Sequence, residues 1–153
     1  MKPSAPTQAK RAGRTILVVD DDTPVLHYIR RALEQANYVV LTSPSGDHAW
    51  TVIERGEASA DLVLADMVMP GSIDGLALAA KIRQREPKLP VLFMTGAGLE
   101  DFEYLAEIST NQLVLRKPFT PKQLIDFIDS SFLLWSQAQI SSDPNRPLEG
   151  YPV

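Results

Sequence analysis

The hydrophobic residues of this chain gather in five short runs that are separated by stretches with helical periodicity. The runs cover residues 15–20, 38–42, 61–66, 90–95 and 112–117. Each is nearly continuous in Val, Leu and Ile, as expected of strands whose two faces are both buried in a parallel sheet. The pattern therefore predicts five buried parallel strands.

Helices are predicted between these strands and after the last one. Thr23 and Pro24 provide a capping hydroxyl followed by proline at the first helical position, and Val25, Ile29 and Leu33 then share one face. Further helices are expected at residues 45–56, 74–85 and 99–109, and from Thr120–Pro121 onward. Five βα units with right-handed crossovers predict an α/β fold with a doubly wound parallel sheet, which binds ligands at the carboxyl ends of its strands.

The two ends of the chain differ in composition from its middle. Residues 1–14 contain four basic residues, two prolines and no acidic residue. Residues 136–153 contain three prolines and few apolar side chains, a composition that favours an unstructured segment. We therefore expect a flexible basic arm at 1–14, one folded domain at 15–135 and a flexible tail at 136–153, with no room for an output domain.

Charge and hydropathy narrow the class of protein. The 153 residues carry a formal net charge of -4, which disfavours direct nucleic-acid binding. No apolar run approaches the ~20 residues that a helix needs to span a bilayer, so we expect no membrane insertion and a cytoplasmic location. Because the chain has no cysteine, a metal site would have to use oxygen or histidine ligands.

Polar residues of a few types follow four of the predicted strands. Asp20 and Asp21 follow the first strand, Asp66 ends the third, Thr95 ends the fourth and Lys117 ends the fifth. Each alone has an ordinary structural explanation, such as a turn, a helix cap or a surface position. Together they are expected to meet, because the carboxyl ends of parallel strands share one edge of the sheet.

Such a cluster favours a particular chemistry. Carboxylates held close together repel one another and need a cation or a shared proton. Mg²⁺ prefers oxygen ligands and leaves coordination positions open for phosphate oxygens. A lysine can neutralise a phosphoryl group and a threonine hydroxyl can hydrogen-bond to it, so these residue types suit phosphoryl transfer.

Four stretches carry a wider similarity: ILVVDDD at 16–22, LVLADMVMP at 62–70 with a following Asp-Gly, VLFMTG at 91–96 and RKPFT at 116–120. With them the chain closely resembles the response regulator receiver family, the CheY-like domains, over about residues 14–135. The resemblance implies a flavodoxin-like (βα)5 fold with strand order 2-1-3-4-5. It also implies a stand-alone, single-domain response regulator of two-component signalling.

The resemblance implies a role for each acidic residue of the cluster. Asp66 would accept a phosphoryl group from a phosphohistidine of a sensor or hybrid histidine kinase or of a phosphotransfer protein. Mg²⁺ would be held by the carboxylates of Asp21 and Asp66, by Asp20 through water, and by the backbone carbonyl of Val68. The chain would then be a phosphoacceptor switch, and not an enzyme acting on other molecules.

The resemblance also implies how the signal is read. Lys117 would contact the phosphoryl group, Thr95 would move toward it, and the Lys117–Pro118 peptide would be cis. The added charge and acceptor oxygens would shift a two-state equilibrium. The fourth predicted helix, the fifth strand and the fifth helix would present the altered surface to a downstream protein.

The sequence departs from the family pattern at several positions. The switch position three residues before the lysine is usually aromatic but here is Val114, so we expect a muted or differently routed conformational change. Val68 and Ala97 occupy positions that tune phosphoryl lifetime, and since neither can orient an attacking water, we expect slow dephosphorylation. MPGSIDG has one residue more than the common form, as in receivers of hybrid kinases, and STNQ replaces the usual small turn before the fifth strand.

Residues 132–135, Phe-Leu-Leu-Trp, could form an exposed apolar patch at the end of the last helix. Such a patch would provide a homodimer or partner interface.

Two other functions stay open at this point. A haloacid-dehalogenase-type phosphatase also combines an aspartate cluster, a threonine and a lysine. That family needs a further acidic pair after the lysine, and the first acidic residues that follow here, Asp126 and Asp129, lie inside a predicted helix. The other alternative is a receiver-like module that binds partners without phosphorylation, although such modules usually lose an acidic residue, the acceptor or the lysine, and all of these are present here.

Overall fold

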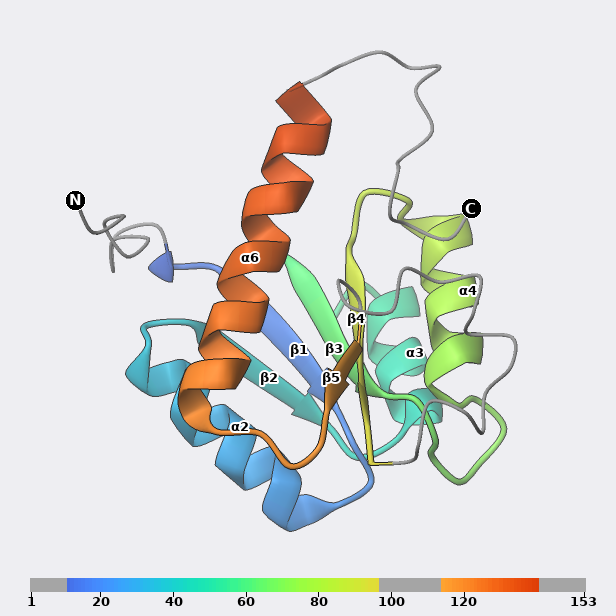
Figure 1. Ribbon diagram of the computed structural model, residues 1–153. Helices are drawn as coiled ribbons and strands as arrows, with labels where there is room; N and C mark the ends of the chain where they lie inside the picture. The colour runs from blue at the N-terminus through green and yellow to red at the C-terminus, as the bar shows by residue number, and fades with distance from the viewer. Residues whose placement is uncertain (1–10, 97–113, 141–153) are drawn as a thin grey trace, which may run out of the picture.

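The structure, a computed structural model that describes residues 11–96 and 114–140, is a five-stranded parallel sheet with helices on both faces (Figure 1). The strands are β1 (Thr15–Val19), β2 (Val39–Ser43), β3 (Leu62–Asp66), β4 (Val91–Thr95) and β5 (Val114–Arg116). They pair in the order β2-β1-β3-β4-β5, and every pair is parallel. The predicted α/β fold, a doubly wound flavodoxin-like sheet with strand order 2-1-3-4-5, is confirmed.

The described helices cover both faces of this sheet, two on each face. They are α2 (Thr23–Gln35), α3 (Gly46–Glu54), α4 (Gly75–Arg85) and α6 (Pro121–Ile140). Helices α2 and α6 contact each other on one face, and α3 and α4 contact each other on the other (Figure 1). Alternate residues of β1 enter the two cores, Ile16 and Val18 beneath α2 and α6, and Leu17 and Val19 beneath α3 and α4. A strand buried on both faces must be apolar throughout, which explains the continuous runs.

The first residues of the helices confirm one predicted cap and correct another. The Thr120 hydroxyl accepts a hydrogen bond from the N–H of Gln123, and the Gln123 side chain accepts one from the N–H of Thr120, which forms a capping box at α6. At α2 the predicted cap, Thr23, is wrong. Asp22 caps this helix, because its carboxylate accepts a hydrogen bond of 3.3 Å from the N–H of Val25.

The ordered part of the chain extends beyond both predicted boundaries of the folded domain, residues 15 and 135. Arg11, assigned to the flexible arm, makes a bidentate pair with Asp129 of α6, with distances of 3.2 and 2.6 Å. Arg14 places its guanidinium 4.4 Å from the ring centre of Phe132. Helix α6 continues to Ile140, so the tail predicted from residue 136 begins inside a helix. Residues 1–10 and 141–153, like the predicted helix at 99–109 and the STNQ segment, lie outside the described residues.

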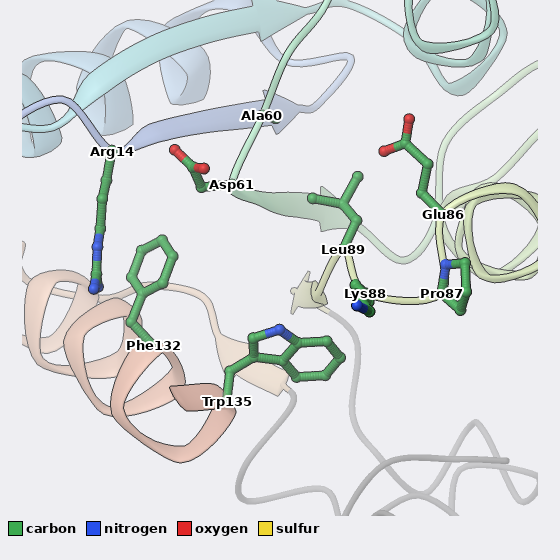
Figure 2. A pocket seen from close by; sticks show the side chains of 9 residues that line it. All are labelled: Arg14, Ala60, Asp61, Glu86, Pro87, Lys88, Leu89, Phe132 and Trp135. Atoms are coloured by element: carbon green, nitrogen blue, oxygen red, sulfur yellow. The ribbon is translucent and has the colours of Figure 1, made fainter. Parts of the chain in front are cut away.

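The predicted apolar patch at residues 132–135 is only partly exposed. Phe132 is buried and Trp135 is half-buried, whereas Leu133 and Leu134 are exposed. Figure 2 shows a hollow at the amino ends of the strands, where Phe132 and Trp135 project from α6 on one side and Leu89 lies on the other. Among the residues that the structure describes, no helix combines the length and apolar character that a membrane crossing requires.

Candidate functional site

Three aspartates converge at the carboxyl edge of the sheet. Asp20 and Asp21 follow β1, and Asp66 ends β3, the neighbouring strand. One carboxylate oxygen from each residue lies within 4.8 Å of the others. Asp20 is fully buried, Asp66 is half-buried and Asp21 is exposed, so the cluster opens to solvent on one side. The predicted convergence of these three residues is confirmed.

Lys117 bridges two of these carboxylates. Its Nζ donates hydrogen bonds of 2.7 Å to Oδ2 of Asp20 and 2.9 Å to Oδ2 of Asp66. Burial raises the pKa of Asp20 above its ordinary value, and the ion pair with Lys117 opposes that effect. Burial alone would lower the pKa of Lys117, but its bonds to the two carboxylates outweigh burial and raise it. One ammonium facing three carboxylates leaves an excess of two formal negative charges.

Backbone groups orient the same carboxylates. The N–H of Val68 donates a 3.1 Å hydrogen bond to Oδ1 of Asp66, and the N–H of Asp22 donates one of 2.9 Å to Oδ1 of Asp20. Each carboxylate is therefore held by a lysine on one oxygen and by an amide on the other. Val68 is 56% exposed beside the cluster. Asp22, the next residue after Asp21, caps α2 with its carboxylate.

Thr95 and Lys117 come from the adjacent strands β4 and β5. Thr95 ends β4 and is buried, and its carbonyl accepts a 2.8 Å hydrogen bond from the N–H of Lys117. The Lys117–Pro118 peptide is cis, as the resemblance implied. Val114 begins β5, pairs with Phe93 of β4 and is buried, so the position usually held by an aromatic residue carries a small apolar side chain inside the core. Ala97 lies outside the described residues.

Gly75 allows the start of α4 to approach the end of β3, a role that was not predicted from the sequence. A Cβ at this position would overlap the carbonyl oxygen of Asp66, so only glycine allows α4 to begin this close to the end of β3. Asp74 caps the helix by accepting a 2.8 Å hydrogen bond from the N–H of Ala77. The Asp-Gly pair at 74–75, which follows the strand that ends at Asp66, is the sequence feature that could have indicated this close approach.

The lengthened segment MPGSIDG is fixed against the start of α3. The N–H of Ser72 donates a 3.2 Å hydrogen bond to Oδ2 of Asp47, and Gly71 has a φ of +107°, which favours glycine. A Cβ at Gly46 would overlap the carbonyl of Ile73, so α3 and this segment are in direct backbone contact. The segment with the additional residue is therefore held against the start of α3, beside the site.

The donor set fits a hard divalent cation. Its side-chain ligands are carboxylate oxygens, which Mg²⁺ and Ca²⁺ prefer, and the excess negative charge would be balanced by a charge of two. The exposed side at Asp21 leaves room for water and for an incoming oxygen ligand. Asp20, Asp21 and Asp66 are the residues of the described chain that could hold such an ion.

Comparison with known proteins gives one family. The family model of the response regulator receiver domain matches residues 16–129. The chain is 34% identical over 116 residues to the phosphate regulon transcriptional regulatory protein PhoB of Pseudomonas aeruginosa, covering 74% of this chain and 49% of that protein. It is 29% identical over 120 residues to the response regulator receiver protein CpdR of Brucella abortus, covering 78% and 98%. The chain thus spans about half of PhoB and nearly all of CpdR.

Solved structures agree with these matches. A response regulator receiver domain protein from Clostridium thermocellum superposes with a TM-score of 0.67 at 28% identity, covering 83% of this chain and 98% of that one. A CheY-like receiver domain protein from Methanospirillum hungatei gives a TM-score of 0.68 at 26% identity, covering 82% and 98%.

Proposed function

We propose that this chain, which belongs to the response regulator receiver family of two-component signalling, accepts a phosphoryl group on Asp66 and thereby changes its contacts with a protein partner. The observation that carries the proposal is the Lys117 ammonium, which lies within hydrogen-bonding distance of both Asp20 and Asp66. A positive group at this point can neutralise a phosphoryl oxygen next to the attacking carboxylate. An acidic cluster with a purely structural role would not need an open side.

In the proposed reaction a carboxylate oxygen of Asp66 attacks the phosphorus of a phosphohistidine. The O–P bond forms as the N–P bond breaks, and the leaving imidazole takes up a proton. Lys117 stabilises the charge on the transferred group, which is the main requirement of phosphoryl transfer. When bound, Mg²⁺ would supply further charge neutralisation. The side chains that would hold it are those of Asp20, Asp21 and Asp66, and the family resemblance adds the backbone carbonyl of Val68. The chain catalyses only its own modification in this proposal.

The phosphoryl group is expected to persist once it is attached. Val68 is exposed beside Asp66 and offers no polar atom on its side chain to orient an attacking water. We expect Val68→Asn to lose the group faster than the wild type, measured as the decay of phosphorylated protein by intact mass. Faster decay in the wild type would contradict this.

The proposed signal leaves through Thr95 and the surface around β5 and α6. Without an aromatic residue at Val114, the Thr95 hydroxyl and Lys117 would carry the conformational change by themselves. The phosphodonor would be a sensor or hybrid histidine kinase or a phosphotransfer protein, and the receiver of the signal a downstream protein. A homodimer through the exposed Leu133 and Leu134, a cytoplasmic location and the absence of direct DNA contact stay predictions.

The proposal is tested by incubating the protein with Mg²⁺ and phosphoramidate and measuring its intact mass. The wild type should gain the mass of one phosphoryl group, and Asp66→Asn should gain none. Asp61→Asn is a matched control, because Asp61 stands just before the amino end of the same strand and accepts a 2.7 Å hydrogen bond from the N–H of Thr15. This control should be phosphorylated like the wild type.

Other outcomes favour the alternatives. Consumption of phosphoramidate without a retained adduct would favour the phosphatase. No reaction in any variant, with the proteins folded, would favour a module that binds partners without phosphorylation.

A further inference from the structure

One side chain joins the two segments that carry the site. Tyr28 lies on α2, the helix that follows Asp20 and Asp21, and its hydroxyl donates a 2.8 Å hydrogen bond to the carbonyl oxygen of Phe119. The two rings also approach each other, with centres 6.0 Å apart and planes inclined by 48°. Phe119 stands two residues after Lys117. The contact therefore connects α2, the helix that follows Asp20 and Asp21, to the segment that follows Lys117.

The segment between β5 and α6 consists of residues 117–120. At its start the N–H of Lys117 is bonded to Thr95, and at its end Thr120 takes part in the capping box of α6. Between them, Pro118 has no N–H to donate. Phe119 packs its side chain against the edge of the core, and its carbonyl is the backbone group through which Tyr28 ties the middle of the segment to α2.

The Tyr28 side of the contact is exposed, so core packing explains little of the position of Tyr28. Tyr28 is 42% exposed, whereas the buried residues of α2 are Leu26, Ile29, Ala32 and Leu33. A half-exposed tyrosine that bonds to a backbone carbonyl fixes position more than it adds hydrophobic stability. The position that it fixes is that of the backbone next to Lys117.

We propose that Tyr28 is a positioning residue for Lys117, acting through the Phe119 carbonyl and the Lys117–Pro118 peptide. The proposal rests on the proposed function. The Nζ of Lys117 bonds to Asp20 and Asp66 at the same time, so a shift of the Lys117 backbone would force its side chain into other rotamers to keep both bonds. Loss of the Tyr28 hydroxyl would let the segment shift and reduce the fraction of molecules with Lys117 in place.

This role has a signature that a loss of folding would not give. With Lys117 displaced, phosphorylation should slow because the transferred group loses its counter-charge. Divalent cation binding should stay equal or become tighter, because a competing cation has left the same carboxylates. A general disturbance of the site would weaken both.

The experiment compares Tyr28→Phe with Tyr38→Phe, which removes one hydroxyl from the opposite end of the molecule, where Tyr38 bonds to Asp129. The rate of phosphorylation by phosphoramidate at saturating Mg²⁺ and the Kd for Mn²⁺ by electron paramagnetic resonance are measured for each variant. Tyr28→Phe should react about five-fold more slowly, the effect of one neutral hydrogen bond, with an equal or lower Kd. Tyr38→Phe should react at the wild-type rate.

A double-mutant cycle with Lys117→Ala tests whether Tyr28 acts through the lysine. In the Lys117→Ala background, Tyr28→Phe should have no further effect on the residual rate. A full five-fold effect in that background, a wild-type rate for Tyr28→Phe, or a weakened Mn²⁺ affinity would each overturn the proposal. If the wild type itself is not phosphorylated, the proposed function fails first, and the two failures are thereby distinguished.

Discussion

Aspartates are paired with cations at both ends of the molecule, but the balance of charge differs. At the carboxyl end of the sheet one cation, Lys117, pairs with Asp20 and Asp66, and a third carboxylate, that of Asp21, lies close to these two. Toward the amino ends of the strands Asp129 accepts two hydrogen bonds from Arg11 and a third from the hydroxyl of Tyr38. One cluster has too few counter-charges, and the other has a complete set.

This difference in charge balance suits one cluster to binding a ligand and the other to stabilising the fold. Under the proposed function, the cluster with excess negative charge would bind a cation and then accept a phosphoryl group, because it is partly open and under-neutralised. The balanced cluster holds the start of the described chain against α6 and leaves no charge for a ligand to satisfy. The same residue types therefore serve two purposes, and the number of counter-charges decides which.

The largest predicted effect comes from breaking the balanced cluster. Asp129→Ala should lower the free energy of unfolding by about 3 kcal/mol, because Arg11 would be left partly buried without a partner. Urea denaturation measures this. Asp126→Ala is the control on the same helix, since Asp126 is 60% exposed in its pair with Lys122, and it should change stability far less. Equal losses would show that the buried pair has no special weight.

Alkaline pH should weaken the balanced cluster selectively. Burial and the hydrogen bond to Asp129 raise the pKa of Tyr38 above its ordinary value. An acid whose pKa is raised by folding stabilises the protein below its unfolded pKa and loses that contribution as the pH rises. Above about pH 10 the wild type should lose about 1.4 kcal/mol per pH unit relative to Tyr38→Phe. Parallel pH profiles of the two proteins in urea denaturation would contradict this.

Divalent cations should stabilise the protein through the cluster of Asp20, Asp21 and Asp66 and not through Asp129. At ten times its Kd, Mg²⁺ should raise the free energy of unfolding by about 1.4 kcal/mol. Asp20→Asn should lose most of this gain at the same Mg²⁺ concentration, whereas Asp129→Asn should keep it. Urea denaturation with and without MgCl₂, at constant ionic strength, measures the effect. An equal gain in both variants would point to non-specific binding.

The smallest predicted effect is a gain in the free energy of unfolding, whereas Asp129→Ala is expected to lower it. Without divalent cations, Asp21→Ala should raise the free energy of unfolding by about 0.5 kcal/mol, because it removes one of three mutually repelling carboxylates at an exposed position. The gain should disappear when Mg²⁺ is added. A loss of stability in the absence of Mg²⁺ would mean that the cluster is already balanced.

The sheet and the core of the site could be predicted because both follow from local pattern and a topological rule. Continuous apolar runs marked the strands, and parallel strands bring Asp20, Asp66 and Lys117 to one edge. The bond between Arg11 and Asp129 spans 118 residues, and no local pattern reports such a partner. The end of α6 was misplaced because prolines were taken as the sign of a tail, although the residues after Trp135 include Gln and Ala, which favour helices.

The start of α2 shows a different limit. Asp22 and Thr23 are adjacent, and both are good capping residues, so propensity alone could not choose between them. The choice depends on where the chain leaves β1, and the bond from the N–H of Asp22 to Asp20 fixes that exit. Tertiary contacts therefore decided a detail that the sequence left ambiguous.

The close approach of Gly75 to the acceptor strand has a consequence for mutational scanning. Every substitution at this position places a Cβ against the carbonyl of Asp66, so a scan scored on signalling output would rank Gly75 beside Lys117 as intolerant. A scan scored on cellular abundance should separate them, because variants at Gly75 would be depleted by misfolding while variants at Lys117 would accumulate as folded, silent protein. Intolerance next to a phosphoacceptor thus has two origins, and only a paired readout assigns each residue to the right one.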